Sequence, residues 1–218
     1  MIPRTAATHW RGMRVIARGI NRICVLDPDA EGHCLKYELP PSRSARRYWR
    51  RRLRYAAGSK ISRLSLNGIE LVAWERLYAR LGNLLCTHAT PCVGLVQTPA
   101  GTALRCRLVT DVNGNPAPTI ATMLATTAAV APAPADLCEA LDSFEAWLFL
   151  HQIPLPDLNA GNLAVTTDNG RLHLVCVDLK STLSGRELIP LSRWSWPLMR
   201  RKMKRRCARL RERIRTTG

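Results

Sequence analysis

The stretch "HQIPLPDLNAGNLAV" (residues 151–165) places an aspartate, Asp157, five residues before an asparagine, Asn162. An amphipathic helix is predicted before it, with a possible capping box at Asp136-x-x-Glu139. The apolar face of this helix comprises Leu137, Leu141, Phe144 and Leu148. A turn at residues 168–170 and the apolar strand "LHLVCV" follow the stretch, and the strand ends at a second aspartate, Asp178. This order of helix, loop, strand and aspartate argues against a chance match.

Residues of these types at this spacing are typical of phosphoryl transfer, which needs oxygen ligands for metal, a cation on the phosphates and an oriented base. Kinase-like enzymes take the base from a loop Asp, and the metal ligands from an Asn five residues later and an Asp after the next strand. The pattern assigns Asp157 as a candidate base and Asn162 and Asp178 as candidate metal ligands. Each also has an ordinary interpretation as a turn or loop residue. For the three as a set we favour the functional interpretation.

The N-terminal part of the chain predicts an antiparallel sheet followed by one main helix. Residues 12–39 read as three strands, with turns at residues 19–21 and 27–29, and Lys36 lies within the third strand. A helix is predicted over residues 67–81, with Glu70 near its start. Taken singly, a strand lysine usually extends to solvent, and a glutamate there favours the helix N-terminus. In a kinase-like site the same two residues would form the phosphate-binding pair.

Most of the positive charge lies in two short segments. The formal net charge is +17; residues 43–54 hold seven arginines, and residues 200–215 hold ten Lys or Arg and one Glu. The remainder is therefore close to neutral. Arg43–Arg54 and Arg200–Arg215 would suit contact with a polyanion such as RNA, anionic lipid or lipopolysaccharide. The second segment predicts a basic helix with a narrow apolar stripe at Met199, Met203, Cys207, Leu210 and Ile214.

The composition indicates a folded protein of 218 residues, 46% of them apolar. The eight cysteines form no CxxC pair, and several lie in apolar runs, so we interpret them as reduced thiols in a cytoplasmic protein rather than as zinc ligands or a redox pair. The N-terminal residues lack the apolar core of a signal peptide, and no apolar run is long enough to span a membrane. We therefore predict a cytoplasmic protein that can associate peripherally with a membrane.

Five blocks of the chain, in order, resemble the YrbL family of bacterial proteins, which are named for control by the PhoP response regulator and are similar to the protein-kinase-like fold. The blocks cover most of residues 12–210 and read "RGINRICVLDPDAEGHCLKYE", "IELVAWERL", "VGLVQTPAGTALRCRLVTDVNGNPAPTIATML", "HQIPLPDLNAGNL" and "VCVDLKSTLSGRELIPLSRWSW". The resemblance implies an α+β, two-lobed fold. An antiparallel-sheet lobe with one main helix would occupy residues 1–115, and a mainly helical lobe with the loop 151–165 and the basic helix would occupy residues 116–218.

The resemblance further implies binding of ATP and Mg²⁺ by a phosphotransferase that is linked to bacterial stress or envelope regulation, and it leaves the substrate unassigned. Lys36 would hold the nucleotide phosphates and Glu70 would orient Lys36, with Gly19 in the phosphate loop. Asp157 would be the base, and Asn162 and Asp178 would bind the metal.

The chain also departs from the kinase pattern. Gly19 is the single glycine of the expected phosphate loop, Leu179-Lys180 follows the metal aspartate in place of Phe-Gly, and Asn159 stands where many kinases carry a phosphate-binding Lys. His151 is interpreted as structural. These departures leave a second interpretation open, a weak or inactive pseudokinase that acts as a basic adaptor for RNA or an anionic surface.

Overall fold

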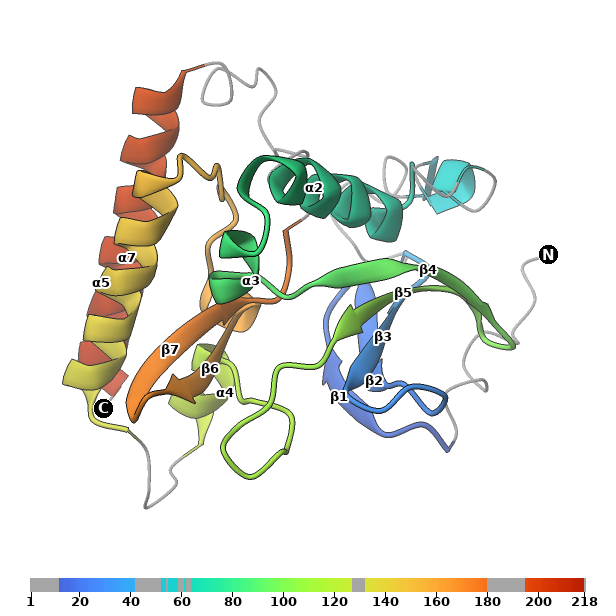
Figure 1. Cartoon of the computed structure of the whole chain (residues 1–218), viewed down its shortest axis with the longest axis horizontal. Helices are drawn as coiled ribbons and strands as arrows, with labels where there is room; N and C mark the ends of the chain where they lie inside the picture. The colour runs from blue at the N-terminus through green and yellow to red at the C-terminus, as the bar shows by residue number, and fades with distance from the viewer. Residues whose placement is uncertain are drawn as a thin grey trace. The chain divides into compact units, whose positions relative to one another are not determined.

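The computed structural model describes residues 12–41, 52–53, 55–58, 61, 64–126, 132–179 and 195–217. These residues form two compact units (Figure 1). The first comprises residues up to Trp74 together with Pro91–Leu108, and the second comprises Glu75–Thr90 and the residues from Val109 onward. The Arg43–Arg54 segment lies outside the described residues apart from Arg52 and Leu53.

The first unit is built on a five-stranded antiparallel sheet in the order β1-β2-β3-β5-β4 (Figure 1). Its strands are β1 (Val15–Arg18), β2 (Arg22–Leu26), β3 (His33–Glu38), β4 (Cys92–Thr98) and β5 (Gly101–Arg107). Alternate residues of β2 and β3 contribute to one core cluster, in which Ile23, Val25, Leu35 and Tyr37 pack with Ala103. The three predicted N-terminal strands are thus confirmed. Burial alternates along β2, as expected for a strand with one face in the core, whereas the four central residues of β3 are all buried.

Helix α2 (Leu66–Leu81) confirms the predicted main helix of the N-terminal part. The side chains of Leu66, Glu70, Ala73 and Leu77 are buried along it, at the spacing of one helical face. Ser65 caps the N-terminus of this helix, because its hydroxyl oxygen accepts a hydrogen bond from the Gly68 amide. This amide has no acceptor within the helix. Glu70 is therefore buried on the face where leucine or alanine would be expected.

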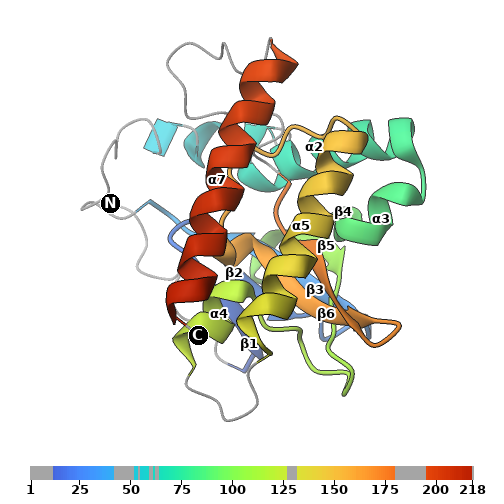
Figure 2. The same cartoon turned by 90° about the vertical axis from the view of Figure 1, so that its left-hand side faces the viewer.

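The second unit contains the two longest helices, α5 (Pro134–Leu150) and α7 (Trp196–Thr217), which lie side by side in Figures 1 and 2. The predicted apolar face of α5 is confirmed, since its four residues are almost fully buried. The predicted stripe of α7 is confirmed as well, because Met199, Met203, Cys207, Leu210 and Ile214 are all buried. At their polar margin, Arg211 of α7 forms ion pairs with Asp142, at 2.5 Å, and with Glu145.

The second unit also contains a two-stranded antiparallel sheet, β6 (Leu163–Asp168) and β7 (Arg171–Cys176), and the short helices α3 (Leu84–His88), α4 (Ile120–Ala125) and η3 (Ala160–Asn162). The predicted turn is confirmed, because Asn169 and Gly170 both have positive φ, as a tight hairpin turn requires. Strand β6 was not predicted, since its short apolar run directly follows the polar loop. The described chain is α+β, with an antiparallel-sheet unit and a largely helical unit.

The start of α5 differs from the prediction. Asp136 lies inside the first turn, and the helix begins at Pro134, with Ala133 as N-cap and no side-chain cap. Proline at the first helical positions has a fixed φ that suits a helix start and lacks an amide proton that would need a partner. The capping box was therefore a wrong prediction. None of the helices among the described residues is both long and apolar enough to cross a membrane.

Candidate functional site

The predicted site residues fall into two groups, one in each unit. In the first unit the structure brings Lys36 and Glu70 together: Lys36 Nζ donates a hydrogen bond to Glu70 Oε1 at 2.8 Å. Both side chains are buried, with 7% of Lys36 and 1% of Glu70 exposed. The register of β2, β3 and β5 places Lys36 between Cys24 and Leu104 in the middle of the sheet. The ordinary interpretation of a lysine extending to solvent is thus excluded for Lys36.

A second cation, Arg22, also binds Glu70, and no sequence pattern indicated it. Arg22 forms an ion pair with Glu70 Oε2 and donates from Nη2 to the Leu66 carbonyl at 2.8 Å. The start of α2 is further tied to β3 by Asn67, whose Nδ2 donates to the Lys36 carbonyl at 2.7 Å. These contacts fix the position of Glu70 relative to the strand that carries Lys36.

The charges of this cluster are set by competition between burial and pairing. Burial alone would raise the pKa of Glu70, but the adjacent Lys36 and Arg22 outweigh it and lower that pKa to about 2. Burial works to lower the pKa of Lys36, whereas Cys106 and Glu70 raise it, and the pKa ends above its ordinary value. Both groups are consequently ionised at neutral pH, and together with Arg22 they leave a positive charge on the sheet.

Gly19 lies in the exposed turn between β1 and β2, as predicted. Its amide donates to the Arg22 carbonyl at 2.8 Å. A Cβ atom at this position would lie 3.7 Å from that carbonyl oxygen, which is an ordinary contact. The turn itself therefore does not require glycine, and a role for Gly19 in binding phosphate stays a prediction.

In the second unit Asp157 and Asn162 are joined through the backbone of the loop. The side-chain amides of Asn159 and Asn162 donate to the Asp157 carbonyl, at 3.1 and 3.3 Å. Asn159 Oδ1 in turn accepts from Gly161 N at 3.0 Å and caps η3. Since its Nδ2 binds that carbonyl, the amide of Asn162 is oriented and its oxygen faces away from Asp157 O.

The hairpin places Asp178 at the same end as Asn162. Leu163, the first residue of β6, pairs with Cys176, the last residue of β7. The next residue, Val177, donates its amide to the Asn162 carbonyl at 2.9 Å. Asp178 therefore follows directly on a residue bonded to Asn162. Amide and carboxylate oxygens are the ligands that Mg²⁺ prefers, so this donor set fits the metal that the sequence predicts.

Helix α7 contributes a residue to this loop that no sequence pattern predicted. Arg206 Nη1 lies 3.4 Å from Asp157 Oδ1, and both side chains are partly exposed. The two residues are 49 positions apart in the sequence. Arg206 is one of many cations in a basic helix, so no sequence pattern distinguishes it as the partner of Asp157. Because Asn159 replaces the usual lysine, Arg206 provides a positive charge beside the candidate base.

A histidine cluster, also missed, holds the strand that leads to Asp178. His88 Nδ1 donates to the Leu174 carbonyl at 2.8 Å, and the ring stacks on His173, whose Nε2 donates to the Thr87 carbonyl at 2.6 Å. Burial, together with His173 and His151, lowers the pKa of His88 to about 4, against the opposing bond to Leu174. His88 is therefore neutral at pH 7. His151 stays structural in this arrangement, since it ends α5 and its carbonyl accepts from Arg80 at 2.9 Å.

Comparison with solved structures finds similarity to protein kinase domains. One double mutant of the Mycobacterium tuberculosis PknI kinase domain matches with 13% identity and a TM-score of 0.41, over 78% of this chain and 58% of that one. A second double mutant of the same domain matches with 12% identity and a TM-score of 0.41, over 79% and 60%. The chain thus spans about three fifths of the kinase domains it matches. No curated protein sequence matches it.

The family comparison covers nearly the whole chain. The family model described as "PhoP regulatory network protein YrbL" matches residues 10–215, a range that includes both groups of site residues and most of the basic helix. The chain belongs to the YrbL family of PhoP regulatory network proteins.

Proposed function

We propose that this protein is a kinase-like phosphotransferase that binds ATP with Mg²⁺ and transfers the terminal phosphate to an anionic or envelope-linked substrate in the bacterial cytoplasm. The observation that carries the proposal is the buried pairing of Lys36 with Glu70. A buried lysine held by an ionised carboxylate is a preformed phosphate-binding cation, because its ammonium group loses little freedom when the ligand binds.

The second group of residues supplies the remaining parts. Asn162 and Asp178 would hold Mg²⁺, which neutralises charge on the phosphates when it is bound. Asp157 would accept the proton of the acceptor hydroxyl, and the loop bonds of Asn159 and Asn162 orient its backbone for this. Arg206 would stabilise the negative charge that Asn159 cannot neutralise.

The nucleotide claim is tested by calorimetric titration of the full chain with ATP in the presence of Mg²⁺. We expect saturable binding, weakened at least about tenfold by Asp178→Ala, because loss of a charged ligand costs more than about 1.4 kcal/mol. Asp168→Ala is the matched control, since Asp168 is an exposed aspartate at the opposite end of the same hairpin. Absence of binding, or equal binding by the wild type and Asp178→Ala, would refute the claim. If ATP binds but no substrate pool is phosphorylated, the protein is a nucleotide-binding pseudokinase.

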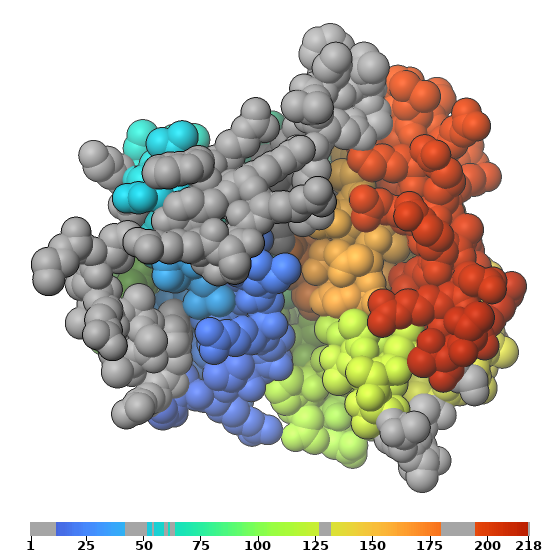
Figure 3. Space-filling model, turned by 180° about the vertical axis from the view of Figure 1, so that it is seen from behind, coloured from blue at the N-terminus to red at the C-terminus, as the bar shows by residue number. Residues whose placement is uncertain are grey.

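The exposed face of α7 favours a second function, that of an adaptor for an anionic membrane or RNA. Its outward residues form one surface of the second unit in Figure 3. Seven of them are exposed cations: Arg200, Arg201, Lys204, Arg205, Arg209, Arg213 and Arg215. Because the apolar stripe is buried against the second unit, this face would bind through charge rather than by insertion.

We expect vesicles with anionic lipid to bind the full chain in a salt-dependent manner. Replacing Lys204, Arg205 and Arg209 by Gln should weaken this binding about 100-fold, because each cation near an anionic surface contributes about 1 kcal/mol. Co-sedimentation at increasing salt measures the effect, with single-stranded RNA as the alternative ligand. If the affinity for vesicles and RNA changed neither with salt nor with the triple substitution, this role for α7 would be excluded.

A further inference from the structure

Three cysteines that lie far apart in the sequence meet in the first unit. Cys92 on β4 is opposite Cys106 on β5, and Cys106 is also opposite Cys34 on β3. Residues opposite each other in neighbouring strands point to the same face of a sheet, and all three thiols belong to one buried cluster. From the sequence these cysteines were interpreted as reduced thiols rather than as zinc ligands, because no short-range spacing joins them.

The separation of two of these thiols suits a tetrahedral metal. Cys92 and Cys106 form a non-hydrogen-bonded pair of the antiparallel ladder, because the neighbouring Arg107 amide donates to the Pro91 carbonyl at 2.9 Å. The side chains of two opposite residues are closest in pairs of this kind. Their sulfur atoms are 3.7 Å apart. Two thiolates at about 2.3 Å from a tetrahedral zinc are separated by about 3.8 Å. No movement of the strands is needed to bring both sulfurs into coordination.

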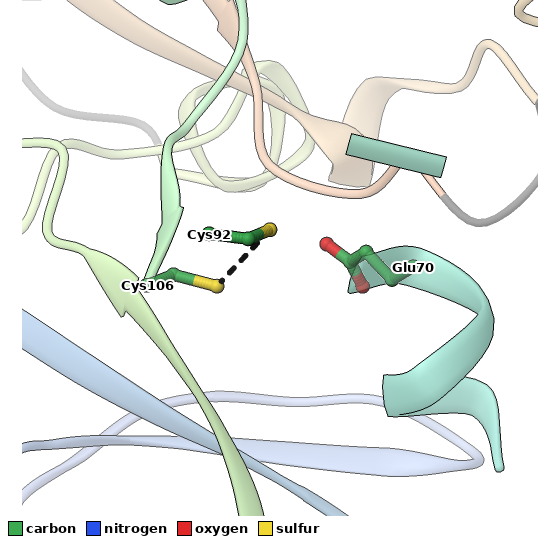
Figure 4. Close-up of side chains that lie close together, drawn as sticks. All are labelled: Glu70, Cys92 and Cys106. Atoms are coloured by element: carbon green, nitrogen blue, oxygen red, sulfur yellow. Dashed lines mark hydrogen bonds between the residues drawn. The ribbon is translucent and has the colours of Figure 1, made fainter. Parts of the chain in front are cut away.

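The carboxylate of Glu70 faces this pair of thiols (Figure 4). One oxygen of Glu70 and the two sulfurs lie within 4.8 Å of one another, and all three residues are buried. We propose that Cys92, Cys106 and Glu70 form a zinc site in the first unit, with these three side chains as its protein ligands. The proposal does not depend on nucleotide binding.

Charge balance supports occupation of this buried position. Zinc binding by two thiols releases their two protons to solvent, so a divalent cation replaces two protons and the net charge of the cluster is unchanged. The cations Lys36 and Arg22, which already contact Glu70, then face a metal centre made anionic by its thiolates and carboxylate. The cluster therefore accepts the metal without the large cost of adding uncompensated charge to the interior.

The donor set selects among metals. Two sulfurs exclude Mg²⁺ and Ca²⁺, which require oxygen ligands, and the carboxylate disfavours Cu(I), which prefers sulfur alone. Zinc accepts both thiolate and carboxylate. A disulfide is the competing chemistry, but it would need an oxidant to take two electrons from the thiols and would have to bring the sulfurs from 3.7 Å to about 2.05 Å.

Cobalt is the spectroscopic probe for this site. The reduced, chelator-treated full chain is titrated with Co²⁺ and then with Zn²⁺. We expect about one cobalt per chain, near-ultraviolet absorption from sulfur-to-cobalt charge transfer, loss of that band on adding Zn²⁺, and release of about two protons. The absence of this band in the wild type would overturn the proposal. The proposal would also be overturned if the reduced protein formed a Cys92–Cys106 disulfide instead of binding the metal.

Variants test whether the assigned residues hold the metal. Cys92→Ser and Cys106→Ser should each weaken cobalt binding at least about 100-fold, more than the loss expected from a residue outside the coordination sphere. Glu70→Gln keeps the size of the side chain and should also weaken binding. Cys138→Ser is the control, because Cys138 is likewise a buried cysteine, on α5 in the second unit. An unchanged band in Cys92→Ser or Glu70→Gln, or its loss in Cys138→Ser, would refute the assignment.

Discussion

Replacing Glu70 with Ala should destabilise the first unit by about 3–5 kcal/mol, the range found when one partner of a buried ion pair is removed. Lys36 and Arg22 both bind this carboxylate, and its removal leaves two cations in an environment that is almost closed to water. Urea unfolding in the presence of a metal chelator measures the loss and separates it from any effect of zinc.

A second glutamate of α2 provides the control, and a second substitution is expected to restore part of the lost stability. Glu75 lies on the exposed side of the same helix, so Glu75→Ala should change stability by no more than about 0.5 kcal/mol. Adding Lys36→Met to Glu70→Ala should restore part of the stability, because the substitution removes one of the two buried charges and keeps the apolar stem. If Glu70→Ala is no more destabilising than Glu75→Ala, the pairing makes no net contribution to stability.

Much of the first unit was predictable because its signals are local. Strand β3 is a short apolar run between a turn and the Pro40-Pro41 pair, and the residues of α2 repeat at helical spacing, so the positions of Lys36 and Glu70 followed from the pattern. Their contact did not follow from it, since nothing local distinguishes a buried lysine from one that extends to solvent. The family resemblance supplied this pairing, and the structure shows the bond between the two side chains.

The unpredicted features depend on contacts between residues distant in the sequence. Arg22 meets Glu70 across 48 positions, and His88 meets Leu174 across 86. Cys92 and Cys106 become neighbours through strand register, which spacing alone does not reveal. The loop around Asp157 lies between these cases: its short-range bonds were accessible to sequence reasoning, whereas Arg206 reaches it only because α7 packs beside α5.

The second large effect is expected at that packing interface. Met203 belongs to the buried stripe of α7 and is fully buried. In Met203→Asp the second unit loses apolar contacts, a loss of about 2–5 kcal/mol for truncation alone, and must also bury a carboxylate or release the helix. We therefore expect a total loss of at least about 4 kcal/mol, measured by thermal and urea unfolding.

Lys204→Asp places the same residue on the exposed face of the same helix and should leave stability nearly unchanged, which separates burial from the change in charge. The pair of variants also tests the origin of the Arg206–Asp157 contact, because release of α7 in Met203→Asp would remove Arg206 from Asp157, whereas Lys204→Asp would leave it in place. Equal stability of the two variants would mean that the apolar stripe does not hold α7 on the second unit. The basic helix would then have to be held by the ion pairs of Arg211 with the exposed Asp142 and the buried Glu145.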